Sequence, residues 1–218
     1  MKKPTFIIVI LLSVSSLVFA QSENYSYRIN DAHCHYVDFV QNTDGIDVLL
    51  DKMDNAGVDN IVLFGLSVTK LWADYDRKRP IYYDDNDAPA YYYSFTDVIL
   101  AEAINKLPEE KKNRVYPLIC GFNPVDKNGL DHIKRMMEMY PDLWVGIGEV
   151  FFRHDDLTRM IYGRNPTANC VSMDPVYEYA AKNNLPIWIH SDIGDPISNK
   201  PTFLYEMEEA ISKHPNTK

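Results

Sequence analysis

Hydrophobic positions along the chain alternate between two patterns. Short, nearly continuous apolar runs are typical of strands buried on both faces, and segments with apolar residues at helical spacing separate them. The predicted strands cover residues 27–35, 60–66, 115–122, 144–151 and 185–190. The predicted helices cover residues 46–56, 95–107, 130–140, 174–183 and 202–213. Five strand–helix units in succession predict an α/β fold with a parallel sheet.

Two parallel α/β architectures fit this alternation, the doubly wound sheet and the (β/α)8 TIM barrel. No G-x-G-x-x-G motif follows the first strand, and Gly146 and Gly148 fall inside a predicted strand instead. The sequence also contains no Walker A motif and no G-x-S-x-G elbow. The usual signals of dinucleotide, P-loop and serine-hydrolase sites are therefore missing. The placement of possible metal ligands decides between the two architectures.

Ionisable side chains stand at the ends of three predicted strands. His33 and His35 lie two residues apart at the end of the first strand, so their side chains point the same way. Glu149 lies near the end of the fourth strand, and His190 ends the fifth. In a barrel the C-terminal strand ends converge on one mouth, where three imidazoles and a carboxylate would form a metal site. Asp31 shares the face of the two histidines and could orient an imidazole.

Each of these residues also has a simpler interpretation on its own. His33 and His35 would be ordinary histidines, Glu149 a helix cap or the partner of a surface lysine, and His190 a hydrogen-bonded core residue. Their joint placement at three strand ends favours the metal site.

These residues carry a resemblance to a known family. Asp31-Ala32-His33-Cys34-His35, the Gly148-Glu149 pair and His190 resemble the amidohydrolase superfamily. The nearer likeness is to its amidohydrolase-related (amidohydrolase 2-like) metal-dependent hydrolases, with TatD-like enzymes nearby. The resemblance implies a TIM barrel with a divalent metal held by His33, His35 and His190. It places Glu149 where related enzymes have a bridging carboxylate or a modified lysine, so that one or two ions fit. Zn²⁺ is the first expectation, with Mn²⁺ or Mg²⁺ as alternatives.

The resemblance also implies positions beyond those of this chain. Family members carry a further histidine on strand 6 and a catalytic aspartate on strand 8, whereas this sequence shows only the first five βα units. We therefore expect residues 21–218 to be the N-terminal part of the barrel domain, with its acid/base aspartate lying further on. A natural short protein completed by self-association, as a homo-oligomer, is the alternative.

Two rim features bear on the substrate. Residues 71–94 form a tyrosine-rich insertion after the second strand, which predicts a lid, an aromatic wall or a packed surface loop. Arg153 follows the fourth strand and could clamp a substrate carboxylate, although an ion pair with Asp155 or Asp156 is the simpler expectation. His154 lies past the strand end and is not predicted to be a ligand, and Cys34 is expected in the core.

Composition and the N-terminus bear on compartment and partners. The formal net charge of −9 disfavours nucleic acid as a partner and leaves a small molecule as the expected substrate. Residues 1–20 begin with Lys2 and Lys3, continue with an apolar run and end at Ala20, as a secretory signal does. That run is shorter than the roughly 20 residues that span a bilayer, so no stable membrane span is expected after cleavage. The protein is expected to be secreted, or periplasmic in a Gram-negative bacterium.

Three functional hypotheses follow. The first is a metal-dependent hydrolase that activates water to attack a small ester, lactone, amide or phosphoester. The second is a metal-dependent decarboxylase of an aromatic or unsaturated acid on the same scaffold. The third is a non-catalytic fragment that only binds metal.

Overall fold

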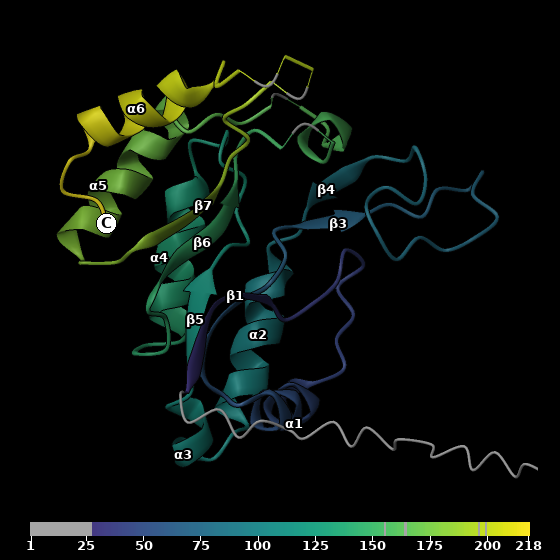
Figure 1. The fold of residues 1–218 in the computed structure, drawn as a ribbon, viewed down its shortest axis with the longest axis vertical. Helices are drawn as coiled ribbons and strands as arrows, with labels where there is room; N and C mark the ends of the chain where they lie inside the picture. Colours follow the sequence, from purple (N-terminus) through teal and green to yellow (C-terminus); the bar gives the residue numbers. More distant parts are fainter. Residues whose placement is uncertain (1–27, 155, 164, 196, 199) are drawn as a thin grey trace, which may run out of the picture.

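The larger sheet has five parallel strands in the order β1-β2-β5-β6-β7 (Figure 1). The computed structural model describes residues 28–218 except 155, 164, 196 and 199, so the predicted signal segment 1–20 lies outside the described residues. The five strands are β1 (Ile29–His35), β2 (Val58–Phe64), β5 (Val115–Ile119), β6 (Gly146–Phe151) and β7 (Ile187–His190). Each lies within a few residues of a predicted strand, and the parallel sheet is confirmed.

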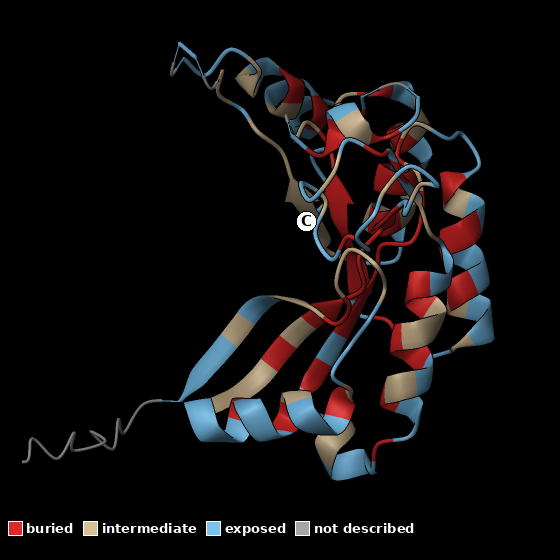
Figure 2. Ribbon diagram, turned by 90° about the vertical axis from the view of Figure 1, so that its right-hand side faces the viewer, coloured by how far each residue is buried: buried red, intermediate tan, exposed pale blue. Residues whose placement is uncertain are grey.

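Helices cover one face of this sheet, and the opposite, concave face is open (Figure 2). They are α1 (Ile46–Ala56), α2 (Phe95–Asn105), α3 (Glu109–Lys112), α4 (Gly129–Met139), α5 (Asp174–Lys182) and α6 (Leu204–Lys213). Two 3-10 turns cover Thr158–Met160 and Val171–Met173. Helix α1 ends where the sequence predicts, because Gly57 adopts the left-handed conformation (φ 70°) that closes a helix. Within the described ranges, no helix is long and apolar enough to cross a membrane.

The middle of the sheet is apolar on both faces, as the hydrophobic runs of β2, β5 and β6 predict. Leu63 and Ile119 belong to the large core that the sheet shares with the helices. Their strand neighbours Phe64 and Leu118 belong to a second, smaller cluster with Cys120, against which Val62 and Trp188 pack. Because successive strand residues point to opposite faces, this second cluster lines the concave side.

Trp188 shows how strongly the sheet curls. Its indole Nε1 donates a hydrogen bond to the Ala32 carbonyl at 3.0 Å. Trp188 belongs to β7 and Ala32 to β1, which are the two edges of the sheet. The five strands therefore form a curled half-barrel, compatible with the first five units of a TIM barrel. Closure into a full (β/α)8 barrel stays a prediction.

A small hairpin that the sequence pattern did not predict precedes α2. Strands β3 (Val68–Lys70) and β4 (Ala90–Tyr92) pair antiparallel and enclose most of the predicted insertion. The backbone N–H of Lys70 donates to the Phe39 carbonyl at 2.7 Å, and Ala90 bridges to Ile161. The buried Lys70 ammonium donates to the carbonyls of Asn86 and Ala88. The hairpin thus joins the loops that follow β1, β2 and β6.

Candidate metal centre

The C-terminal ends of β1, β6 and β7 meet at one place, as the barrel interpretation predicts. One ligand atom from each of His33, His35 and Glu149 lies within 4.8 Å of the other two. His190 approaches from β7, and its Nδ1 lies 3.0 Å from Oε1 of Glu149. The structure therefore brings all four predicted residues together around one carboxylate.

Glu149 is the centre of this group and is only 3% exposed. Its Oε2 lies 3.1 Å from Nε2 of His35, and its Oε1 lies 3.7 Å from Nε2 of His33. Yet Oε2 accepts no well-formed hydrogen bond from any described residue. A buried carboxylate oxygen without such a bond is costly unless a further partner satisfies it. This oxygen, facing imidazole nitrogens, fits a divalent cation.

The local backbone turns Glu149 toward the centre. Between Ile147 and Val150, strand β6 has one residue more than β7 opposite it, which is a β-bulge. Bulges re-aim side chains and are common beside active sites. Gly148 lies within the bulge with φ +127°, and a Cβ there would meet the Trp188 carbonyl oxygen at 2.5 Å. Only glycine fits this position.

His35 is oriented by a backbone carbonyl. Its Nδ1 lies 3.0 Å from the Gly65 carbonyl oxygen, so Nδ1 carries a proton and Nε2 is the nitrogen that faces the centre. The Phe64 ring supports both histidines of β1, with edge-to-face centroid distances of 5.0 Å to His33 and 4.8 Å to His35. His33 is the more exposed of the two, with about half of its side chain accessible.

Asp31 does not orient an imidazole, contrary to one expectation from the sequence. Its carboxylate accepts the backbone N–H of His33 at 2.9 Å. The reason is a register shift of β1 against β2 between Asp31 and Cys34, which breaks the two-residue alternation assumed for this strand. The Gly65 carbonyl takes the role that the sequence suggested for Asp31.

Charge at the centre is balanced between the carboxylate and the imidazoles. Burial by itself would raise the pKa of Glu149, but the hydrogen bond from His190 and the adjacent imidazoles of His35 and His33 lower it to about 2. The same hydrogen bond to Glu149 raises the pKa of His190 against the opposing effect of burial. A cation that enters the group would likewise stabilise the charged carboxylate of Glu149.

His154, which the sequence analysis did not predict to be a ligand, lies beside this site. Its ring stacks on that of His190, with centroids 4.5 Å apart and planes 15° from parallel. Burial and the neighbouring His190 lower the pKa of His154. The signal available in the sequence was its position just after β6, on the same rim as the four candidate ligands.

Arg153 pairs with a carboxylate that the sequence analysis did not name. Its guanidinium Nη2 lies 2.5 Å from Oε1 of the buried Glu206, and its Cζ lies 3.7 Å from the centre of the Phe203 ring. Asp156 pairs with Arg159 instead, and Asp155 lies outside the described residues. A role for Arg153 in binding a substrate carboxylate stays a prediction.

The remaining histidines and Cys34 lie apart from the ligand group. His132 bonds the buried Asp97 at 2.7 Å, and His214 bonds Asp174 at 2.9 Å, so both pair with carboxylates of helices. Cys34 packs against the main core, as expected.

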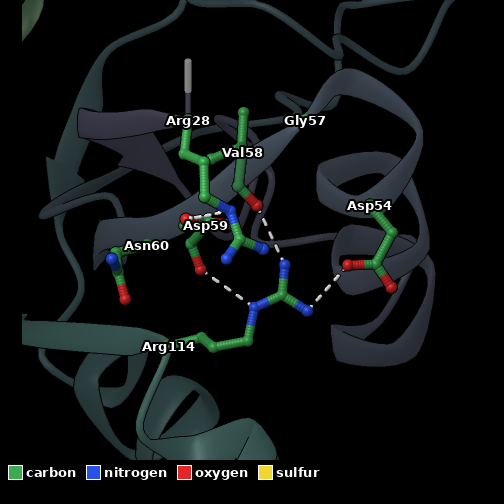
Figure 3. A pocket seen from close by; sticks show the side chains of 7 residues that line it. All are labelled: Arg28, Asp54, Gly57, Val58, Asp59, Asn60 and Arg114. Atoms are coloured by element: carbon green, nitrogen blue, oxygen red, sulfur yellow. Dashed lines mark hydrogen bonds and ion pairs between the residues drawn. The ribbon is translucent and has the colours of Figure 1, made fainter. Parts of the chain in front are cut away.

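A pocket of about 550 Å³ lies at the opposite, N-terminal end of the strands (Figure 3). Its two arginines are both paired with carboxylates. Arg28 lies 2.6 Å from Asp59, and Arg114 lies 2.7 Å from Asp54. Arg114 also donates to the carbonyls of Val58 and Asp59. Arg114 thus joins β2 to α1, Arg28 pairs with β2 from just before β1, and the pocket is separate from the candidate metal centre.

Comparison with known proteins identifies the fold. No protein-family model and no curated protein matches the chain. The chain is similar to the crystal structure of 2,6-dihydroxybenzoate decarboxylase from Rhizobium, with a TM-score of 0.51 and 14% sequence identity. The alignment covers 88% of this chain and 64% of that one, so this chain spans under two thirds of the neighbour's length. At this identity the likeness shows the fold alone.

Proposed function

We propose that this chain builds the cation-binding half of a metal-dependent hydrolase of the amidohydrolase type. One observation carries the proposal: the buried Oε2 of Glu149 lies 3.1 Å from Nε2 of His35 without a well-formed hydrogen bond, inside a group in which ligand atoms of His33, His35 and Glu149 lie within 4.8 Å of one another. His33, His35, Glu149 and His190 supply nitrogen and carboxylate ligands of the kind that Zn²⁺ binds. Mn²⁺ and Mg²⁺ are the alternative ions, and Glu149 together with the histidines would hold one ion or two.

A bound divalent metal supplies Lewis acidity, which lowers the pKa of water and polarises a substrate carbonyl or phosphoryl oxygen. The residues of this chain prepare for that chemistry. Gly65 fixes the His35 tautomer, so that Nε2 is held ready to bind. Glu149 bonds Nδ1 of His190 and so holds that ring beside the group. The low pKa of Glu149 keeps its carboxylate charged throughout the neutral range.

The proposed substrate is a small ester, lactone, amide or phosphoester in a secreted or periplasmic setting. Decarboxylation of an aromatic acid is the second candidate, and it is favoured by the fold shared with 2,6-dihydroxybenzoate decarboxylase. The third candidate, a chain that binds metal without turnover, differs from both in lacking any activity.

Metal titration of matched variants tests the proposal. The protein is stripped with EDTA and titrated with Zn²⁺ by calorimetry, next to Glu149→Gln and the control Glu110→Gln. We expect Glu149→Gln to weaken Zn²⁺ binding at least about 100-fold, because it removes a charged ligand. Glu110 is an exposed residue of α3 and should leave binding unchanged.

Turnover of loaded protein then separates the first two candidates. Hydrolysis of a lactone panel supports the first, and CO₂ release from 2,6-dihydroxybenzoate supports the second. Metal binding without either activity fits the third candidate and also a chain that builds only the cation-binding half of an enzyme, so turnover discriminates between the first two. Equal Zn²⁺ affinity in Glu149→Gln and wild type would exclude the metal centre.

A further inference from the structure

Two aromatic residues that the ligand set leaves unused lie next to the metal centre. Tyr83 belongs to the insertion between β3 and β4, and His154 belongs to the loop after β6. Their rings meet edge to face, with centroids 5.7 Å apart. Neither residue belongs to the proposed ligand set, so metal binding by these two side chains does not explain their arrangement.

A line of three successive side-chain contacts connects the insertion to the Glu149 carboxylate. Tyr83 touches His154, His154 stacks on His190, and His190 bonds Glu149. Phe39 supports the outer end, with its ring 4.9 Å from that of Tyr83. The line therefore joins the loop after β1, the insertion and the strand end of β7.

His190 depends on this line for its orientation. Its Nδ1 is held at one edge by Glu149, and a face of the ring is covered by His154. Phe151 contributes an edge-to-face contact at 5.6 Å. A hydrogen bond at one edge still permits rotation about that bond, and a parallel ring 4.5 Å away blocks it. The stacked ring is thus the contact that fixes the imidazole plane.

We propose that His154 is a positioning residue for His190, and that Tyr83 couples the inserted hairpin to the metal centre through it. Residues that orient a ligand tune the metal without touching it. The effect of this coupling on metal affinity rests on the function proposed above. The coupling itself is a property of the metal-free protein and is tested there first.

The first experiment observes the imidazoles of the metal-free protein by NMR. The chain has six histidines, so their ring signals can be assigned one by one with single substitutions. We expect Tyr83→Ala to shift the ring signals of both His154 and His190. Tyr75→Ala is the matched control, because Tyr75 lies in the same insertion and is 71% exposed. It should move neither ring. Tyr83→Phe keeps the ring contact and should match the wild type.

The second experiment titrates the same variants and two His154 variants with Co²⁺, following its visible absorption spectrum. We expect His154→Ala to weaken Co²⁺ binding about tenfold and to alter the spectrum, as loss of an orienting residue does. His154→Phe retains a stacking ring and should bind within about threefold of wild type. This rescue separates a positioning role from loss of the fold.

The two readouts fail separately. Unchanged His190 signals in Tyr83→Ala would overturn the coupling, whatever the protein binds. Equal Co²⁺ affinity and spectra in wild type, His154→Ala and His154→Phe would overturn the positioning role. If the His190 signals shift in Tyr83→Ala but the wild-type protein binds no Co²⁺, the coupling is supported and the proposed function is contradicted instead.

Discussion

At the level of single residues, Glu149 combines deep burial with a full negative charge. It keeps that charge because three imidazoles surround it and lower its pKa to about 2. The ordinary value for such a carboxyl is 4.5, so protonating Glu149 costs the folded state more than the unfolded one. Its stabilising contribution is complete above pH 4.5 and is lost as the pH falls toward 2.

This difference predicts an acid-sensitive stability in the metal-free protein. Between pH 5 and pH 3 we expect the free energy of unfolding of wild type to fall by about 2 kcal/mol more than that of Glu149→Gln. Urea denaturation at the two pH values measures it, and taking the difference between variants removes the effect of other carboxylates such as Asp174. A Glu149→Gln protein that loses stability as steeply as wild type would contradict the pairing.

Sequence reasoning named the residues that gather at the candidate site but missed the partners that hold them in place. His33, His35, Glu149 and His190 stand at strand ends, a position that hydrophobic patterning reveals. The partners of such residues depend on the three-dimensional fold. Arg153 pairs with Glu206, which lies 53 residues further along the chain, and no local sequence pattern predicts a contact between residues so far apart.

At the level of elements, the bulge in β6 determines where Glu149 points. The bulge depends on Gly148, whose φ of +127° is outside the range of residues with a side chain. A regular strand would follow the two-residue alternation of Ile147 and would direct the carboxylate elsewhere. One glycine in an otherwise buried strand therefore creates the centre.

We predict that Gly148→Ala lowers the free energy of unfolding by about 3 kcal/mol and weakens Zn²⁺ binding. The new Cβ would meet both an unfavourable φ and the Trp188 carbonyl. Gly57→Ala is the control. Gly57 also has a positive φ, but a Cβ there meets nothing within 4 Å, so only about 1 kcal/mol should be lost and metal binding kept. Thermal denaturation measures the loss of stability and Zn²⁺ titration measures the loss of affinity. Similar losses of stability in the two variants would rule out the steric argument.

The sequence predicted helix α1 but not strands β3 and β4, and the difference has a physical reason. Helix α1 has an amphipathic stripe and a terminal glycine, and both its ends agree with the prediction. Strands β3 and β4 have three residues each and include the polar Thr69 and Lys70. They exist because Lys70 is buried against carbonyls of the insertion, an arrangement that hydrophobic periodicity does not signal.

At the level of the whole molecule, the metal centre depends on the curl of the sheet. The proposed ligands come from β1 and β7, which are the two edges of the sheet, and from β6, the neighbour of β7. Strand alternation predicted the parallel sheet, while the curl depends on side chains that meet across the concave face. Trp188 is one of these, because its indole spans from β7 to the Ala32 carbonyl, next to His33.

We predict that Trp188→Phe loosens β1 selectively and weakens metal binding. The change removes one hydrogen bond, which costs about 1 kcal/mol of stability. Trp144→Phe is a close control, because the Trp144 indole also donates one hydrogen bond of 3.0 Å, to the Met136 carbonyl near α4. The two variants should therefore lose a similar free energy of unfolding and differ in which part of the fold opens more easily.

Amide hydrogen exchange locates the difference, since local opening is fastest where cross-sheet contacts are lost. Exchange in β1 should accelerate in Trp188→Phe and stay at the wild-type rate in Trp144→Phe. Zn²⁺ affinity should fall in the first variant only, because His33 and His35 would no longer be held at a fixed distance from His190. If both variants exchange alike in β1, the indole does not hold the edges together. The packing of Phe64 and Leu118 would then have to sustain the curl that assembles the site.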